Sequence, residues 1–597
     1  MAKDRYPRSR NSRVHYTVRW SRMFVLLLIV AVVVIAAILL LRPKSGSPGK
    51  TPDPTKTTLP DGTVVDIIPE TPTPTPSPTP APPTPVDATK PDAFGLRTDL
   101  NVDGDNVSSY TRKDPVYFDE GEEYAAIEGI IAFRGNNYRA ATSFGTPNVK
   151  NAKMEVMWNV VTASVPKGTG SGKWTGVGWT GQPLIVRWPA KTRAIMNINE
   201  TKKAKDGLVE VIYAAEDGLV YFIDLEDGLL TRKTINVGNP FKGSGCLDPR
   251  GYPLLYLGTG DWTPAHSGRK EQRNAAYVYS LIDTTQIYAF GKEPDPFAQR
   301  EFHAYDGNAT INAAADTLIQ PGENGILYTL KLNTQFNEAE GTISVAPTEL
   351  VKLRYSTSRI RNGMDNNTYW RGMETSPVFW RNYCFFADNS GTLLCVNLNT
   401  MNVLWAQDLQ DDTNSSPILE IENGKPYIYI APSLHWTAKD DKGAVSISKV
   451  NAMTGEFVWQ RPYDCYTVNS VSGGVQATGL LGKNSLSGLV YYAVARTPNK
   501  SDGVLVALNK SDGSEKWSFK MNNYTWASPV AVYGQDGTGY VIVGDSAGYL
   551  HLLDGLTGNV LDKVLLNEGT IEATPAVFGD MIVAGTRNGG IYGIKIS

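Results

Sequence analysis

The chain has 597 residues, of which 41% are hydrophobic and 20% charged, an ordinary composition for one large or several small folded domains. Its 57 basic and 60 acidic side chains leave a net charge of −3. Because nucleic acid is bound by concentrated basic surface, this balance argues against a nucleic-acid partner.

The N-terminal region combines a basic tail, residues 1–22, with an uninterrupted apolar run, Met23–Leu41. At about 1.5 Å per residue, a helix over this run nearly spans a hydrocarbon core of about 30 Å. More basic residues precede the run than follow it, which predicts a cytoplasmic N-terminus and an extracytoplasmic remainder. A cleaved signal peptide is the alternative, but no small-residue cleavage motif directly follows the run. We therefore predict a single-pass protein of the cell membrane.

Residues 42–91 are rich in proline and threonine, as in "TPTPTPSPTPAPPTP". Proline fixes φ and lacks an amide hydrogen, so this stretch is predicted to be a disordered stalk that favours polyproline II at about 3.1 Å per residue. Residues 92–150 follow as an extracellular lead-in, and residues 151–597 as the main folded domain.

Within the lead-in, "DLNVDGDNV" (Asp99–Val107) matches the first half of a calcium-binding loop. The twelfth position of that loop is Tyr110 instead of the required glutamate. The flanking residues alternate like strands around an Asp-Gly turn, so we predict a β-hairpin and no metal site.

Four cysteines occur, at 246, 384, 395 and 465, and none forms a CxxC pair. This spacing argues against a disulfide scaffold and a structural zinc site. Cys384 and Cys395 flank a turn at nearly equal distances, so either a disulfide across a hairpin or two buried thiols remains open.

Beyond residue 150, short alternating runs separated by Gly, Asn and Asp turns predict an all-β domain. A pattern of Asn or Asp, Gly four residues later and Trp four residues after that recurs, fully in "NAMTGEFVW" (Asn451–Trp459) and "NKSDGSEKW" (Asn509–Trp517). The Asn side chain can close the turn, and Gly accepts the left-handed conformation that reverses the strand. A small or polar residue before a strand-opening proline forms a second recurring signature.

These signatures divide the domain into four-stranded units, which is typical of a β-propeller. We count eight units, and seven remains an alternative because the second and third lack the Trp turn. Their predicted openings lie near Pro183, Pro249, Asn312, Pro377, Pro417, Gln476, Pro529 and Pro575. The last unit has only three strands, so we expect the strand around Trp158 to complete it and close the ring.

The blade motifs resemble the PQQ-repeat, or quinoprotein-like, family of eight-bladed propellers. "FRGNNYR" (Phe133–Arg139) resembles the lead-in of its non-enzymatic members. The resemblance implies either a quinone-dependent dehydrogenase or a propeller that binds proteins or acts as a scaffold, as in outer-membrane protein assembly. The dehydrogenases carry adjacent cysteines above the quinone, and no two cysteines are adjacent here. The predicted membrane helix and stalk, in place of a lipidated N-terminus, favour a cell surface of the Gram-positive type.

Aromatic residues precede several strand-opening prolines, at joints expected to face one mouth of the axial channel. With nearby polar residues they form a candidate binding site for a protein or cell-wall glycan. Its members are Trp179, Arg361, Asp365, Trp370, Glu374 and Trp526. The alternative is that these tryptophans only pack between blades.

Catalysis has no local support, since the five histidines are scattered and no nucleophile motif occurs. We therefore predict a monomeric, non-catalytic propeller without a cofactor that acts as a membrane-anchored binding or scaffold module. An oxidoreductase using PQQ or another cofactor at the channel mouth is the alternative, and glycan hydrolysis would need a pair of carboxylates about 5 to 9.5 Å apart.

Overall fold

The computed structural model describes residues 56–58, 64–66 and 81–597, except 169–170, 180, 264–272, 360–367, 470 and 567–568. Residues Met1–Ala81 and Pro82–Ser597 are two separate compact units. The first contains a hairpin of β1 (Lys56–Thr58) and β2 (Val64–Asp66). Within the described ranges, no helix is long and apolar enough to cross a membrane, and the predicted helix Met23–Leu41 lies outside those ranges.

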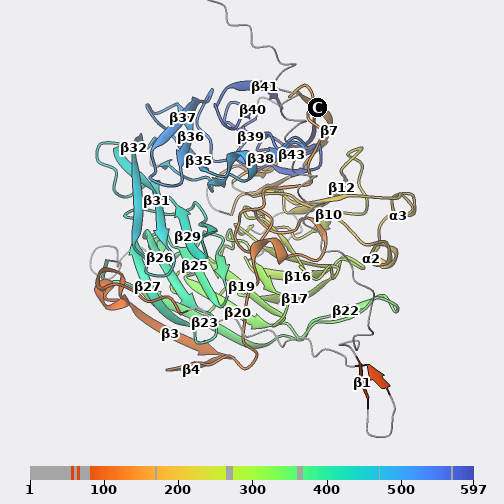
Figure 1. The fold of residues 1–597 in the computed structure, drawn as a ribbon, viewed down its shortest axis with the longest axis horizontal. Coiled ribbons are helices and arrows are strands. Elements are labelled where there is room, and N and C mark those ends of the chain that lie inside the picture. The colour runs from red at the N-terminus through yellow and green to blue at the C-terminus, as the bar shows by residue number, and fades with distance from the viewer. Residues whose placement is uncertain are drawn as a thin grey trace, which may run out of the picture. The chain divides into compact units, whose positions relative to one another are not determined.

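The second unit is an eight-bladed β-propeller, as predicted, and its blades follow one another in chain order around a central axis (Figure 1). Blade 1 contains β10 (Leu184–Arg187), β11 (Glu210–Ala214), β12 (Leu219–Asp224) and β13 (Ile235–Asn236). Blade 2 contains β14 (Cys246–Leu247), β15 (Leu254–Gly258), β16 (Ala276–Ser280) and β17 (Gln286–Phe290). Blade 3 contains β18 (Thr310–Asn312), β19 (Thr317–Gly322), β20 (Ile326–Lys331) and β23 (Thr348–Ser356). Blade 4 contains β24 (Val378–Trp380), β25 (Tyr383–Ala387), β26 (Thr392–Asn397) and β27 (Asn402–Asp408).

The second half of the ring repeats this antiparallel order. Blade 5 contains β28 (Ile418–Glu422), β29 (Lys425–Ile430), β31 (Lys442–Asn451) and β32 (Phe457–Tyr466). Blade 6 contains β30 (Ser433–Leu434), β33 (Gly473–Gly474), β34 (Leu480–Leu481), β35 (Leu489–Ala495), β36 (Gly503–Asn509) and β37 (Glu515–Lys520). Blade 7 contains β38 (Val530–Tyr533), β39 (Gly539–Gly544), β40 (Tyr549–Asp554) and β41 (Val560–Leu565). Blade 8 contains β42 (Ala576–Phe578), β43 (Met581–Thr586), β44 (Gly590–Ile596) and β7 (Met154–Val161).

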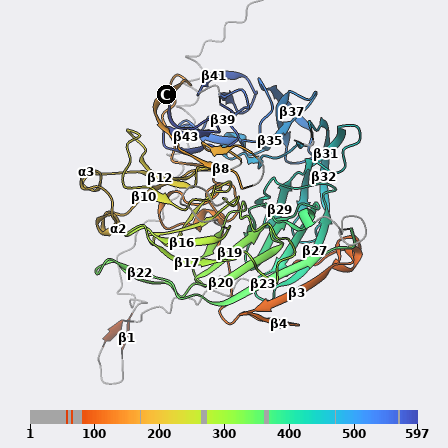
Figure 2. The same cartoon turned by 180° about the vertical axis from the view of Figure 1, so that it is seen from behind.

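Blade 8 is the seam where the ring closes. Its outer strand β7 comes from the start of the domain and pairs antiparallel with the C-terminal strand β44, with Trp158 opposite Gly593. Figure 1 places the C-terminus beside β7, and Figure 2 shows the same end of the chain from behind, near β41 and β43. The predicted closure by strands from both ends of the chain is therefore confirmed, and no blade is left incomplete.

Where the recurring tryptophan is present, it joins its blade to the next. The indole N–H of Trp459 in blade 5 donates to the carbonyl oxygen of Lys510 in blade 6 at 2.9 Å, and Trp405 in blade 4 donates to Ala452 of blade 5 at the same distance. Each ring also covers the turn glycine of the next repeat, so a Cβ added at Gly513 would stand 2.6 Å from Trp459. The repeat glycine is thus needed for its positive φ of 72° and for the close approach of the neighbouring ring.

The residues before the strand-opening prolines, together with Thr478 before Gly479 in blade 6, link the inner ends of the blades. The backbone N–H of Ser376 donates to Oγ of Ser416 in the next blade at 2.8 Å, and Ser416 N–H donates to Thr478 Oγ1 at 3.1 Å. Thr478 N–H continues to Ser528 Oγ at 3.0 Å, and Ser528 N–H to Thr574 Oγ1 at 3.4 Å. A small hydroxyl side chain at this position therefore satisfies a buried amide of the preceding blade.

The FRGNNYR segment, with its neighbours, crosses the inner ends of the blades. The carbonyl oxygens of Asn137 and Tyr138 accept hydrogen bonds from Phe379 N–H in blade 4 and Leu419 N–H in blade 5. On one side of the segment β5 (Glu128–Ile130) pairs with β10 of blade 1, and on the other β6 (Ser143–Phe144) pairs with β42 of blade 8. The segment therefore ties distant blades together at the axis.

Two arginines of this segment are fully buried. Arg139 Nε donates to the carbonyl of Pro377 at 3.0 Å, and its other nitrogens reach Asn308 Oδ1 and Thr310 Oγ1. Arg134 Nη1 donates to the carbonyl of Pro529 at 3.1 Å. Burial lowers the pKa of Arg139 to about 10 and of Arg134 to about 9. Carbonyl and amide oxygens from several blades thus take the place of water around these guanidinium groups.

The rest of the lead-in also packs on the propeller. The predicted hairpin around Asp103 is confirmed, since β3 (Arg97–Val102) pairs with β4 (Asp105–Val107) and extends the sheet of blade 3. The end of the predicted stalk packs on the propeller, since Thr84 N–H donates to the carbonyl of Met453 at 2.8 Å. The short helices nearby are η1 (Asp87–Thr89), η2 (Pro91–Phe94) and η3 (Gly121–Glu123).

A few short helices and strands lie between the main strands of the blades. They are β8 (Ser164–Pro166), β9 (Lys173–Thr175), α2 (Ala190–Ile195), α3 (Glu200–Lys203), β21 (Gln335–Asn337), β22 (Thr342–Ser344), η4 (Thr368–Arg371) and η5 (Asn484–Leu486).

The cysteines are thiols and form no disulfide, since all four are buried and free. Phe385 is the register partner of Cys395, so Cys384, one residue earlier on β25, faces the opposite side of the sheet.

Candidate functional site

A cavity of about 450 Å³ lies at one mouth of the axial channel. Its lining comes from the joints between blades and from two blade hairpins, so residues far apart in the sequence converge on the axis. Its lining includes Lys167, Trp174, Trp179, Lys242, Arg300, Phe302, Asp306, Glu323, Tyr369, Glu374, Asp412, Asn414, His435, Val471, Trp526 and Arg587.

Aromatic side chains form one part of the wall. Trp179, in the joint entering blade 1, meets Trp526, in the joint entering blade 7, edge to face with ring centroids 5.6 Å apart. Trp526 is 9% exposed, and its indole Nε1 has no hydrogen-bond partner in the described part of the chain. A buried indole N–H usually has a partner, so this donor is available to a ligand in the cavity.

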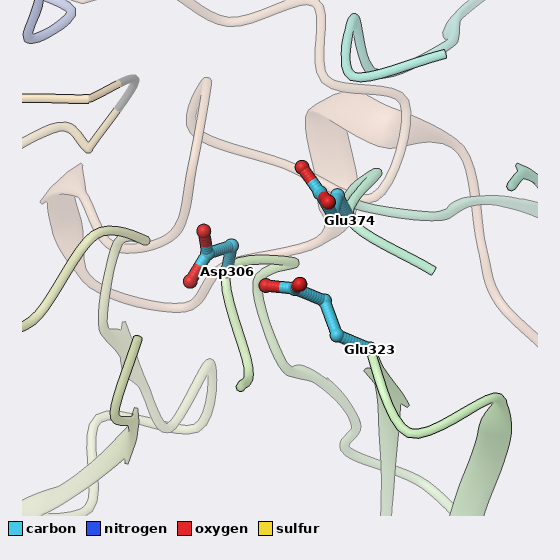
Figure 3. Close-up of side chains that lie close together, drawn as sticks. All are labelled: Asp306, Glu323 and Glu374. Carbon is cyan, nitrogen blue, oxygen red and sulfur yellow. The ribbon is translucent and has the colours of Figure 1, made fainter. Parts of the chain in front are cut away.

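Three carboxylates that line the cavity lie close together (Figure 3). Asp306 lies in the joint entering blade 3, Glu323 in the β19–β20 hairpin and Glu374 in the joint entering blade 4, with one oxygen of each within 4.8 Å of the others. Burial raises the pKa of Asp306 to about 7, although the Lys242 ammonium opposes the rise. Burial also raises the pKa of Glu323 well above its ordinary range, and Glu374 and Asp306 add to this. The three groups therefore repel one another in a poorly solvated space.

Two cations partly compensate this acidic cluster. Arg300 Nη1 lies 3.0 Å from Glu323 Oε2. The Lys242 ammonium lies over the rings of Trp179, Trp174 and Phe302, at 5.0, 5.3 and 5.7 Å from their centroids. Burial lowers the pKa of Lys242, but the carboxylates of Asp306, Glu323, Asp261 and Glu374 together hold it above its ordinary value. Lys242 is thus a charged group held by aromatic faces and by nearby acids.

More carboxylates surround this centre. Asp412 accepts a hydrogen bond from the Tyr369 hydroxyl at 2.9 Å, whereas its buried Oδ1 has no partner among the described residues. Burial, followed by Glu374, raises the pKa of Asp412 well above its ordinary range. On the far side, Arg587 Nη1 pairs with Glu572 at 2.8 Å and Nη2 lies 3.6 Å from Glu216. Lys167 also lines the cavity, with its ammonium 4.3 Å from the centroid of the Trp174 ring, and the acidic groups named above still outnumber the cations.

The structure brings together three of the residues predicted for the mouth, since Trp179, Glu374 and Trp526 all line the cavity. Trp370 lies behind them, with its ring 5.5 Å from His435 and 5.9 Å from Trp436. Its position fits the packing alternative. Arg361 and Asp365 lie outside the described residues. The binding role of these residues remains a prediction.

Sequence reasoning missed the charged centre of the site. These charged residues are Lys242, Asp306 and Glu323. They lie in blades 2 and 3, where the Trp turn is lacking, so the repeat motif does not align their positions with those of the other blades. Asp306 lies at the joint position in "YDGNAT", and aligning that position with Glu374 in the joint of the next blade could have indicated it. Glu323 gave no signal, because its place in a tight hairpin is apparent only from the fold.

Comparisons with known proteins agree with this architecture. Residues 443–597 match the PQQ_2 family model, described as outer membrane protein assembly factor BamB. The resemblance to PQQ-repeat propellers is confirmed. Two curated relatives carry the same description. That of Legionella pneumophila (strain Paris) is 26% identical over 37% of this chain and 51% of its own length, and that of Kangiella koreensis is 25% identical over 34% and 45%. The chain spans about half the length of these PQQ-repeat relatives.

A solved structure supports the fold over a longer range. Quinohemoprotein alcohol dehydrogenase ADHIIG from Pseudomonas putida HK5 superposes with a TM-score of 0.53, covering 81% of this chain and 83% of that one at 11% identity. This likeness concerns the propeller fold alone.

The acids at the centre of the mouth disfavour a PQQ cofactor there, although Lys242 and Arg300 line the same cavity. PQQ carries several carboxylate groups, which would face the mutually repelling acids Asp306, Glu323 and Glu374. The cysteines are separate and buried in the blades, so they supply no adjacent pair over the cavity.

Proposed function

We propose that this protein is a non-catalytic propeller that binds a protein partner at the channel mouth and serves as an assembly or scaffold module. The observation that carries the proposal is the mouth cavity, where aromatic faces and unsatisfied polar atoms converge from many blades. Such a mixture of rigid aromatic surface and polar groups is typical of protein-binding sites. The description of the curated relatives as an outer membrane protein assembly factor supports the same class of function.

We further propose that the propeller acts outside the cytoplasm, held to the cell membrane by Met23–Leu41 and spaced from it by the part of residues 42–91 that precedes Thr84. The apolar run, the basic residues before it and the proline-rich composition after it support this topology. Residues 92–150 would then act as the lead-in and residues 151–597 as the binding domain.

Affinity capture with the full-length chain, solubilised in detergent from its own cells, tests the binding role. The wild-type protein is compared with Trp526→Ala at the mouth and with Val560→Ala on the outer strand β41, where Val560 is 49% exposed. We expect a partner that is retained by wild type and Val560→Ala and lost with Trp526→Ala. Equal capture by all three proteins would place binding elsewhere on the propeller.

A further inference from the structure

We infer that the mouth cavity accepts a basic side chain, a lysine or arginine, presented by a peptide segment of the partner. This inference rests on the proposed function, because it specifies the chemistry that a protein partner must bring to the same cavity. It follows from three features of the mouth: an excess of acids, buried acceptors without donors, and a buried donor without an acceptor.

The excess of acids is local. Arg300 is engaged by Glu323 at 3.0 Å, and Arg587 is engaged by Glu572 at 2.8 Å. Lys242 remains to balance Asp306 and Glu374 at the centre. A further positive group would relieve the repulsion among these carboxylates, since opposite charges in a poorly solvated site attract strongly.

Unsatisfied atoms show which hydrogen-bonding groups the ligand must carry. Oδ1 of Asp306 and Oδ1 of Asp412 are buried acceptors that lack a donor within the described structure. Asp412 is fully buried, and it lines the same cavity without belonging to the cluster of three acids. Both atoms fit the N–H donors of an ammonium or guanidinium group.

The tryptophan at the mouth supplies an independent observation. Nε1 of Trp526 is a donor, and it too has no partner in the part of the chain that the structure covers. It cannot bind a cation, but it can donate to a backbone carbonyl oxygen. One ligand that carries both a cationic side chain and a carbonyl group is a peptide with a basic residue.

The aromatic walls suit the rest of such a side chain. Trp179, Trp174 and Phe302 already surround the ammonium of Lys242, which shows that this lining stabilises an alkylammonium group. A divalent metal ion fits less well. Calcium takes six to eight oxygen ligands, whereas Arg300 and Lys242 place positive charge beside the same carboxylates.

Binding of short peptides to the full-length chain in detergent tests this inference. The probe is acetyl-Gly-Gly-Lys-Gly-Gly-amide, followed by the change in tryptophan fluorescence. The matched peptides carry norleucine, which keeps the methylenes without the charge, or Nζ-acetyl-lysine. We expect the lysine peptide to bind at least about tenfold more tightly than either, as for loss of a charge-assisted hydrogen bond.

Two variants locate the effect. Asp412→Asn should weaken binding of the lysine peptide by about tenfold and leave the norleucine peptide unchanged. Glu301→Gln is the matched control, because Glu301 is exposed and does not line this cavity. Circular dichroism of each variant shows whether it is folded, and Glu374→Gln serves as a second test if Asp412→Asn does not fold.

Equal binding of the lysine and norleucine peptides would overturn the inference, as would binding of neither. Stoichiometric binding of calcium chloride that displaces the lysine peptide and is lost in Glu374→Gln would also overturn it in favour of a metal. The proposed function is tested separately: a partner captured through the mouth but indifferent to lysine-to-norleucine exchange would contradict this inference alone. Failure to capture any partner would contradict the proposed function.

Discussion

The indole ring of Trp459 in blade 5 covers Gly513 in blade 6 so closely that a Cβ at Gly513 would stand 2.6 Å from the ring. Gly513→Ala should therefore lower stability by about 1 to 3 kcal/mol through overpacking, in addition to the strain of its positive φ. Gly537→Ala is the matched control, since Gly537 has a φ of 82° and no atom within 4 Å of an added Cβ. Urea unfolding of both variants measures the difference, and equal midpoints would contradict the packing role of the repeat glycine.

A second prediction concerns the hydrogen-bonded ring of small side chains. Ser416→Ala removes the acceptor of the Ser376 N–H, which donates at 2.8 Å. A buried N–H without a partner costs about 1 to 3 kcal/mol, so the unfolding midpoint should fall by a corresponding amount. Ser487→Ala, at an exposed position, is the control. If Ser416→Ala and the control Ser487→Ala have the same unfolding midpoint, the ring of small hydroxyl side chains does not stabilise the joints between blades.

A third prediction concerns Arg139, whose guanidinium group binds Pro377, Asn308 and Thr310. Arg139→Lys keeps the positive charge but cannot make all of these hydrogen bonds. We expect a loss of at least about 2 kcal/mol, since a hydrogen bond to a charged group contributes about 1.5 to 3 kcal/mol. Arg97→Lys, on the exposed side of β3, should have little effect on thermal unfolding. An unchanged melting temperature in Arg139→Lys would show that the hydrogen bonds of Arg139 do not stabilise the inner ends of the blades.

A fourth prediction concerns pH. Burial raises the pKa of Glu216 from 4.5 to about 7, and neither carboxylate oxygen has a hydrogen-bond partner among the residues described. The folded state therefore keeps a proton that the unfolded state releases between these pH values, so Glu216 makes stability fall as pH rises through this window.

Glu216→Gln cannot ionise and should lose this dependence. Its gain in stability over wild type should be small below pH 4.5 and largest above pH 7, at about 1.4 kcal/mol for each tenfold difference in proton affinity. Thermal unfolding at several pH values, with exposed Glu155→Gln as the control, measures this gain. A difference between Glu216→Gln and wild type that does not change with pH would contradict the account.

The sequence predicted the propeller and its closure because the repeat residues act locally. Asn451 and Gly455 form their own turn, and the spacing to Trp459 is fixed by the returning strand. The same signals located Trp179 and Trp526 at joints that enter blades. The sequence did not predict the centre of the site, because Lys242, Asp306 and Glu323 converge only once the ring closes. Nor did it show that Trp405 and Trp459 donate across blade boundaries, since that contact depends on the rotation between blades.

Site-specific photocrosslinking in living cells tests most directly whether the channel mouth holds a protein partner. A photoreactive residue replaces Val471, which lines the cavity and is 39% exposed, or Val560, which lies on the outer strand of blade 7. If a protein partner occupies the mouth, we expect a discrete crosslinked species from position 471 that is absent from position 560. The same species from both positions, or from position 560 alone, would contradict a partner-binding mouth.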